Sequence, residues 1–151
     1  MSMADYDRAR TMLSTGNAVL HFAGPRPPAL IDKAEAALGV QYPESYRRFL
    51  LEYGAGSVGS AEFYGVIDGN WDDSSVPDGV WCTLSERHQS RLPDHLVVIG
   101  DTGSGMLYVI DTSEPGGPVY VLAPWDLAAG RQRVADDFGE YFLQRVSAAL
   151  G

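Results

Sequence analysis

Residues 96–122 read LVVIGDTGSGMLYVIDTSEPGGPVYVL and contain three short runs rich in β-branched and aromatic residues. The runs at 96–99, 106–110 and 119–122 are typical of β-strands. Links of six and eight residues join them, which permits antiparallel hairpins and excludes helical crossovers. The stretch therefore predicts three neighbouring strands of an antiparallel sheet.

Helical periodicity lies on both sides of these strands along the chain. The expected helices span residues 4–13, 29–38, 43–54 and 134–150. The clearest apolar stripe is formed by Tyr46, Phe49, Leu50 and Tyr53, in a helix that begins at Pro43. The remaining segments predict a turn over 54–60, a strand over 62–67, an acidic loop over 68–79, a strand or a helix over 80–89 and a loop over 124–130. Helices segregated from a run of strands predict an α+β fold with helices packed on a central antiparallel sheet.

Length and composition predict one domain over residues 1–151. The chain is 45% hydrophobic, which is enough for a core that needs no metal or disulfide. Its one cysteine, Cys82, cannot form an internal disulfide. The first residues carry two acids and no apolar signal-peptide region, and the apolar runs are far shorter than the ~20 residues of a membrane span. We therefore expect a cytoplasmic protein.

Negative charge is concentrated in the middle of the chain. The net charge is −9, and residues 49–130 hold twelve acids against only two bases, Arg87 and Arg91. Such a chain disfavours nucleic acid and anionic membranes as direct partners. The acids either form a solvated face that keeps the protein soluble, or they form a surface for a basic partner protein.

The sequence from Asp101 to Ser104, DTGS, matches the motif of aspartic proteases, and Asp111 begins a degraded second copy. The chemistry requires two carboxylates about 3 Å apart. Asp101 and Asp111 stand at the two ends of one predicted strand, so they cannot meet within one chain. A dimer that pairs two copies of Asp101 is the only hydrolase the pattern allows, and a glycine-rich hairpin turn explains the same residues.

Other catalytic and binding motifs are missing from the sequence. Gly100 to Gly105 has the glycine spacing of a phosphate-binding loop, but Met106 and Leu107 stand where lysine and Ser/Thr are required. The spacing of Cys82 and the three histidines fits no zinc site. We expect no cofactor, no metal and no catalytic residues. Trp81 and Trp125 are expected in the core, whereas Trp71 stands among acids and fits a contact residue or a core cap.

Several segments together resemble the SUKH superfamily, which includes yeast cell-wall assembly regulators and many bacterial immunity proteins. The resemblance runs from about residue 30 to 146 and leaves 1–24 as an N-terminal extension. It is carried by residues 38–54, 62–65, 92–101, 105–111, 118–121 and 134–143. It implies an α+β fold with a central antiparallel sheet, no catalytic residues, and an antitoxin role against secreted toxins, many of which are nucleases.

Because nucleases that bind phosphate carry basic surfaces, the resemblance favours the acidic stretch as a toxin-binding surface. The expected contact residues are Glu62, Asp68, Trp71, Asp72, Asp73 and Asp78. The leading interpretation is a non-catalytic immunity protein that binds a basic toxin domain. The alternative is a regulatory or scaffold protein of the same fold with an endogenous partner, and a distant one is the dimeric hydrolase that uses Asp101.

Overall fold

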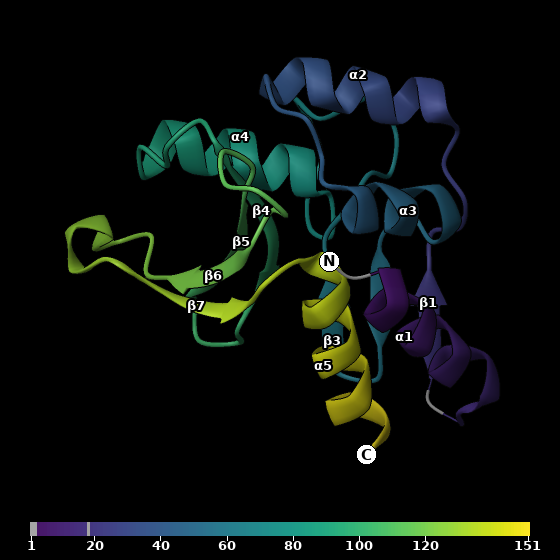
Figure 1. The fold of residues 1–151 in the computed structure, drawn as a ribbon. Coiled ribbons are helices and arrows are strands. Elements are labelled where there is room, and N and C mark those ends of the chain that lie inside the picture. Colours follow the sequence, from purple (N-terminus) through teal and green to yellow (C-terminus); the bar gives the residue numbers. More distant parts are fainter. Residues whose placement is uncertain (1–2, 18) are drawn as a thin grey trace.

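A computed structural model describes residues 3–17 and 19–151 and confirms the α+β class (Figure 1). The helices are α1 (Met3–Thr15), α2 (Pro28–Leu38), α3 (Glu44–Glu52), α4 (Gly79–Gln89) and α5 (Phe138–Leu150), with a 3₁₀ turn η1 (Leu127–Ala129). The strands are β1 (Leu20–Phe22), β2 (Gly56–Val58), β3 (Ala61–Phe63), β4 (Leu96–Asp101), β5 (Leu107–Asp111), β6 (Val119–Leu122) and β7 (Arg131–Ala135).

The described strands form two antiparallel sheets, one ordered β1-β2-β3 and the other β4-β5-β6-β7. The sheets meet where the Tyr64 N–H donates to the Ile99 carbonyl oxygen at 2.9 Å. The three predicted strands 96–122 are confirmed as β4, β5 and β6. Where one central sheet was expected, the chain builds a pair of sheets that join at β3 and β4.

Two strands lie where the sequence predicted other structure. Residues 56–58 form β2 instead of a flexible turn, because β1 pairs with them. A Cβ at Gly56 would lie 2.0 Å from the carbonyl oxygen of His21, so only glycine permits this approach. Residues 131–135 form β7, and the last helix begins at Phe138 instead of about residue 134. The Asp137 carboxylate fixes that start, since it accepts a hydrogen bond from the Glu140 N–H at 2.8 Å.

The main core lies among helices α1, α2, α3 and α5, the three-stranded sheet and one face of the four-stranded sheet. The Phe49 ring contacts those of Phe63, Phe138 and Phe142 at centroid distances of 5.8, 5.2 and 5.3 Å. Helix α1 belongs to this core, because its Tyr6 is fully buried and stacks on Phe142 at 5.5 Å. The region read as an N-terminal extension therefore covers the core.

A second apolar cluster fills the space between α4 and the four-stranded sheet, and it includes Tyr64, Val98 and Leu107. Residues 80–89, left open between strand and helix, form most of α4. Trp81 is partly buried against this cluster. The expectation that Trp125 is buried is wrong: its side chain is 68% exposed in the connection from β6 to β7.

Candidate partner-binding surface

The acidic segment 68–78 is anchored to the fold at its start and in its middle. The Arg26 guanidinium donates to the Ile67 carbonyl oxygen at 2.7 Å, and the Asp68 carboxylate accepts from the Asn70 N–H at 2.9 Å. Gly69 lies beside α2, where a Cβ would be 3.6 Å from the Lys33 ammonium nitrogen. Trp71 is half-buried and packs against the main core. The segment is therefore held in place, although it contains no regular element.

Four of the predicted carboxylates are exposed. Glu62, Asp68, Asp72 and Asp73 face solvent, and within the described residues none of them forms an ion pair. By contrast, acids elsewhere lie within 4.0 Å of arginines: Asp7, Asp32, Glu35, Glu52, Asp94, Asp111, Glu114 and Asp136. The unpaired acids therefore leave a negative potential that the fold does not cancel.

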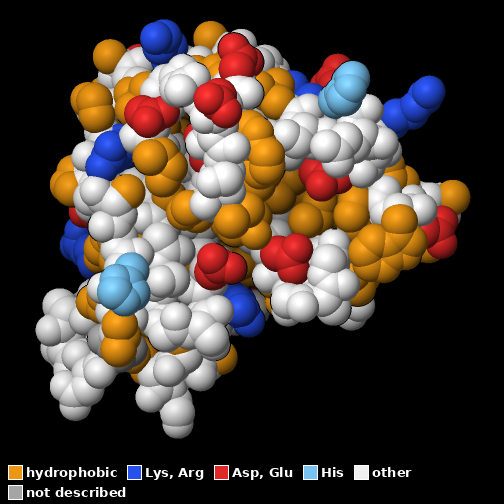
Figure 2. All heavy atoms as spheres, turned by 180° about the vertical axis from the view of Figure 1, so that it is seen from behind, with side chains coloured by type: hydrophobic (Ala, Val, Ile, Leu, Met, Phe, Trp, Pro, Cys, Tyr) orange, Lys and Arg blue, Asp and Glu red, His pale blue; other side chains and the backbone are white. Residues whose placement is uncertain are grey.

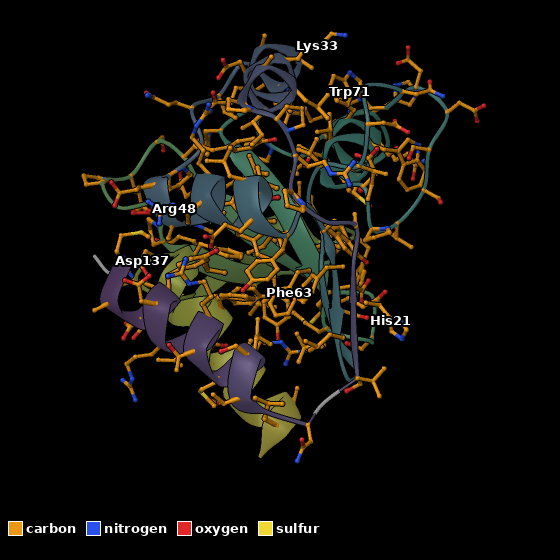
Figure 3. All side chains as sticks on the ribbon, turned by 90° about the vertical axis from the view of Figure 1, so that its right-hand side faces the viewer. His21, Lys33, Arg48, Phe63, Trp71 and Asp137 are labelled. Carbon is orange, nitrogen blue, oxygen red and sulfur yellow. The ribbon has the colours of Figure 1, made fainter. Side chains whose placement is uncertain are left out.

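Glu62 and the acidic segment lie on one side of the molecule. In the three-stranded sheet, Glu62 pairs with Ser57 and Ser57 with His21, so these side chains line one sheet face. Figure 3 places His21 and Trp71 on the side opposite Arg48 and Asp137. Figure 2 shows this side, where acids lie above and below an apolar band. We call Glu62, Asp68, Trp71, Asp72 and Asp73 the acidic face.

Asp78 does not belong to this surface, and its inclusion among the contact residues is corrected. Its side chain is fully buried, and its Oδ1 accepts hydrogen bonds from the N–H groups of Val80 and Trp81, both at 3.0 Å. Asp78 is thus the N-terminal cap of α4. Burial raises its pKa above the ordinary aspartate value. A D-G-V-W sequence before an apolar helix is a capping signal that the sequence reading overlooked.

Trp71 combines the two roles that the sequence left open. Its indole packs on the main apolar cluster, and the side chain remains partly exposed beside Asp72 and Asp73. When a partner covers a half-buried tryptophan, binding costs little conformational entropy, because packing already holds the ring in place. The geometry therefore suits a contact residue that also closes the core.

Asp101 and Asp111 lie at opposite ends of the β4–β5 ladder and form no dyad within the chain. Asp101 pairs with Leu107, whereas Asp111 pairs with Leu96. The Asp101 carboxylate accepts from the N–H groups of Gly103 and Gly105 at 2.6 and 3.3 Å, so it organises the hairpin turn. The buried Asp111 carboxylate lies 2.7 Å from the Arg131 guanidinium. Both aspartates have structural partners.

The sulfur and imidazole groups do not converge. Cys82 is buried, and burial raises the pKa of its thiol to about 12, which suppresses the reactive thiolate. The ring of His95 lies 3.7 Å from the Asp111 carboxylate. Across the part of the chain that the structure describes, no three His, Cys, Asp or Glu side chains gather as metal ligands would.

Among the hollows on the described surface, two stand out, and no sequence pattern indicated either of them. One, of about 400 Å³, lies between the start of α3 and the β5–β6 turn and is lined by Glu44, Glu114 and Asp137 among others. Glu114 accepts a hydrogen bond from the Tyr120 hydroxyl at 2.6 Å, and Asp137 caps α5. The other, of about 290 Å³, lies between β4 and the β6–β7 connection and is mostly apolar. Neither collects the carboxylates of the acidic face.

Comparison with known protein families identifies the family of this chain. A family model, SUKH_5, described as SMI1-KNR4 cell-wall, matches residues 8–147. The chain belongs to the SUKH superfamily. The match begins within α1, earlier than residue 30, in agreement with the packing of α1 on the core. SUKH proteins include immunity proteins and SMI1/KNR4-like proteins, and they are generally non-catalytic. Among the helices that the structure describes, none has the length and apolarity of a membrane span.

Proposed function

We propose that this SUKH protein is a cytoplasmic immunity protein, a non-catalytic binding module that neutralises a basic toxin domain by covering its active face. The observation that carries the proposal is the acidic face. Its carboxylates at Glu62, Asp68, Asp72 and Asp73 are exposed and lack ion pairs within the described residues, while eight other acids lie within 4.0 Å of arginines. Unpaired charge on an anchored surface is what a partner of opposite charge can use.

The physical advantage of such a surface is the speed of capture. Complementary charge raises association rates from about 10⁵–10⁶ to 10⁸–10⁹ M⁻¹s⁻¹ at low salt. A toxin that attacks nucleic acid must carry cationic groups for phosphate, and these groups face the inhibitor when it occupies the same site. Trp71 adds an apolar contact beside Asp72 and Asp73, at which water can be excluded.

The alternative is a regulatory or scaffold protein that binds an endogenous partner. The description of the matching family as cell-wall proteins favours it. The two functions differ in gene context, because an immunity gene stands directly beside the gene of its toxin. An isolated gene favours regulation.

The deciding experiment is co-expression of the full chain with the toxin domain encoded beside its gene. Survival of the cells is the result expected for an immunity protein. Cell death in the presence of well-expressed, folded chain would refute the immunity function. The purified pair then gives the association rate at low and high salt.

Charge reversal tests the acidic face within that experiment. The double variant Asp72→Lys with Asp73→Lys should slow association and flatten its dependence on salt. The matched control compares Asp72→Lys alone with Glu44→Lys, because Glu44 is an exposed acid outside the acidic face that also lacks an ion pair within the described residues, and both changes alter net charge equally. Equal slowing by these two single variants would show that overall charge acts, and not the acidic face.

A further inference from the structure

The exposed Trp125 is the largest apolar side chain that the fold leaves in solvent, and it is held in a fixed position. Its ring lies against the turn that joins β4 to β5: a Cβ at Gly105 would be 3.3 Å from its Cζ3 atom. Gly105 has a φ of +91°, so glycine is required there both for the backbone and for the indole. The Cζ3 end of the ring therefore contacts the turn, and 68% of the residue remains exposed.

The Asp101 carboxylate organises the turn that this indole contacts. Its Oδ1 accepts from the N–H groups of Gly103 and Gly105, and the turn closes through the Thr102 N–H, which donates to the Met106 carbonyl oxygen at 2.9 Å. On the other side, the Asp126 N–H donates to the Ala123 carbonyl oxygen at 3.1 Å, which fixes the chain at Trp125. The DTGSG sequence thus acts as the support of a tryptophan.

Two carboxylates without ion pairs within the described residues belong to the turn and to the residue after Trp125. Asp126 follows Trp125 in the chain and is exposed, and the half-buried Asp101 holds the turn that the indole contacts; neither aspartate forms an ion pair within the described residues. The junction between the sheets brings the Glu62 backbone to Gly100, the residue before Asp101, since the Glu62 carbonyl oxygen would lie 3.5 Å from a Cβ at Gly100. Burial is the largest cause of the raised pKa of Tyr64, and the carboxylates of Glu62 and Asp101 raise it further.

We infer that Trp125 and the carboxylates of Asp101 and Asp126 form an anchor for an arginine or lysine side chain of the partner protein. The exposed indole face attracts a cation through its ring quadrupole, and the carboxylates supply the charge. This anchor rests on the proposed function, because it assigns a basic partner a specific contact. It extends the acidic face from Glu62 to the turn between β4 and β5.

The test uses the full chain labelled with 5-fluorotryptophan, whose fluorine resonances report Trp71, Trp81 and Trp125 separately. The probe is a blocked hexa-arginine peptide, with hexa-serine as the neutral control. The Trp125 resonance should shift in a saturable manner with hexa-arginine and remain still with hexa-serine. An unchanged Trp125 chemical shift in the presence of hexa-arginine overturns the anchor.

Substitutions separate the anchor from general attraction to an acidic protein. Trp125→Ala should weaken hexa-arginine binding about two- to fivefold, the range of an exposed cation–π contact, and Trp125→Phe should weaken it less. Asp101→Asn keeps the acceptor for the turn and removes the charge. Its matched control, Glu44→Gln, removes one charge from the 400 Å³ hollow by the β5–β6 turn, which follows the end of β5 far from Asp101. Equal weakening by Asp101→Asn and Glu44→Gln overturns the anchor.

The same spectra distinguish the anchor from the acidic segment. If Trp71 alone shifts, the acidic face remains the basic-partner site and the Trp125 anchor is wrong. If Trp125 alone shifts, the anchor stands and Asp72 and Asp73 do not contact the cation. If neither shifts, both assignments are wrong.

Discussion

At the scale of single residues, three aspartates of this chain have three different roles. Asp78 caps a helix from a buried position, Asp111 is buried against Arg131, and Asp72 is exposed without an ion pair in the described structure. Sequence reading grouped Asp78 with Asp72 because both stand in one acidic stretch. Burial separates them, since a buried carboxylate must be hydrogen-bonded whereas an exposed one is hydrated.

The first prediction concerns the α4 cap. Asp78→Ala should lower the free energy of unfolding by about 0.5–2 kcal/mol, because the N–H groups of Val80 and Trp81 lose their acceptor. Asp78→Asn keeps a side-chain oxygen and should cost less. Urea unfolding measures both variants, and an Asp78→Ala protein as stable as the wild type would contradict the capping role.

The second prediction concerns the pH dependence of Asp111. Burial raises its pKa, but the hydrogen bonds from Ser113 and the Arg131 guanidinium outweigh burial, and the pKa is lowered overall. The folded chain therefore holds the ionised carboxylate more strongly than the unfolded chain does. This stabilisation is complete above the ordinary aspartate pKa of about 3.9 and is lost as pH falls through the lowered value.

Asp111→Asn should remove this loss of stability at acidic pH. The free energies of unfolding of the variant and the wild type should therefore converge as pH falls. Urea unfolding between pH 2 and pH 7 is the measurement. Parallel curves over the whole range would show that the Asp111 carboxylate contributes nothing to acid sensitivity.

At the scale of secondary structure elements, local capping and long-range pairing decide where elements begin and end. The helix over 134–150 was predicted too early because Val134 and Phe138 have helical spacing. Asp137 and Glu140 form a capping arrangement that starts α5 later, with the Glu140 carboxylate accepting from the Asp136 N–H at 2.6 Å. Strand β1 has only three residues, and its pairing with β2 defines it.

The third prediction tests whether α1 is part of the core. Tyr6→Ala should lower the free energy of unfolding by about 3–5 kcal/mol, because it removes a fully buried ring that stacks on Phe142. Arg8→Ala, an exposed substitution on the same helix, should change stability by less than about 0.5 kcal/mol. Similar small effects of both would mean that α1 is detachable from the core.

At the scale of the whole molecule, the placement of arginines shapes the electrostatic surface. Arg47 lies within 3.0 Å of carboxylates of Asp32 and Glu35, and Arg131 contacts Asp111. The acidic face lacks such ion pairs within the described residues, although the Lys33 ammonium group stands near Gly69 of the acidic segment 68–78. The protein therefore retains self-repulsion on one side, a feature that favours binding over stability.

The fourth prediction follows from this self-repulsion. Replacing Asp72 and Asp73 by Asn should leave the free energy of unfolding unchanged or raise it, by less than about 0.5 kcal/mol at low salt. Added salt should reduce that difference, since it screens exposed charges. Urea unfolding at two salt concentrations measures both effects. A clear loss of stability in the variant would mean that these carboxylates have structural partners.

Patterns in the amino-acid chain were enough to predict the α+β class, the three strands of 96–122, most helices and the negative middle of the chain. These features arise from local periodicity, turn length and composition, which act over a few residues. The burial of Asp78, the exposure of Trp125 and the approach of the Glu62 backbone to Gly100 became visible only in the folded chain. Exposure and the meeting of distant side chains depend on how the two sheets join, and no short-range pattern encodes that packing.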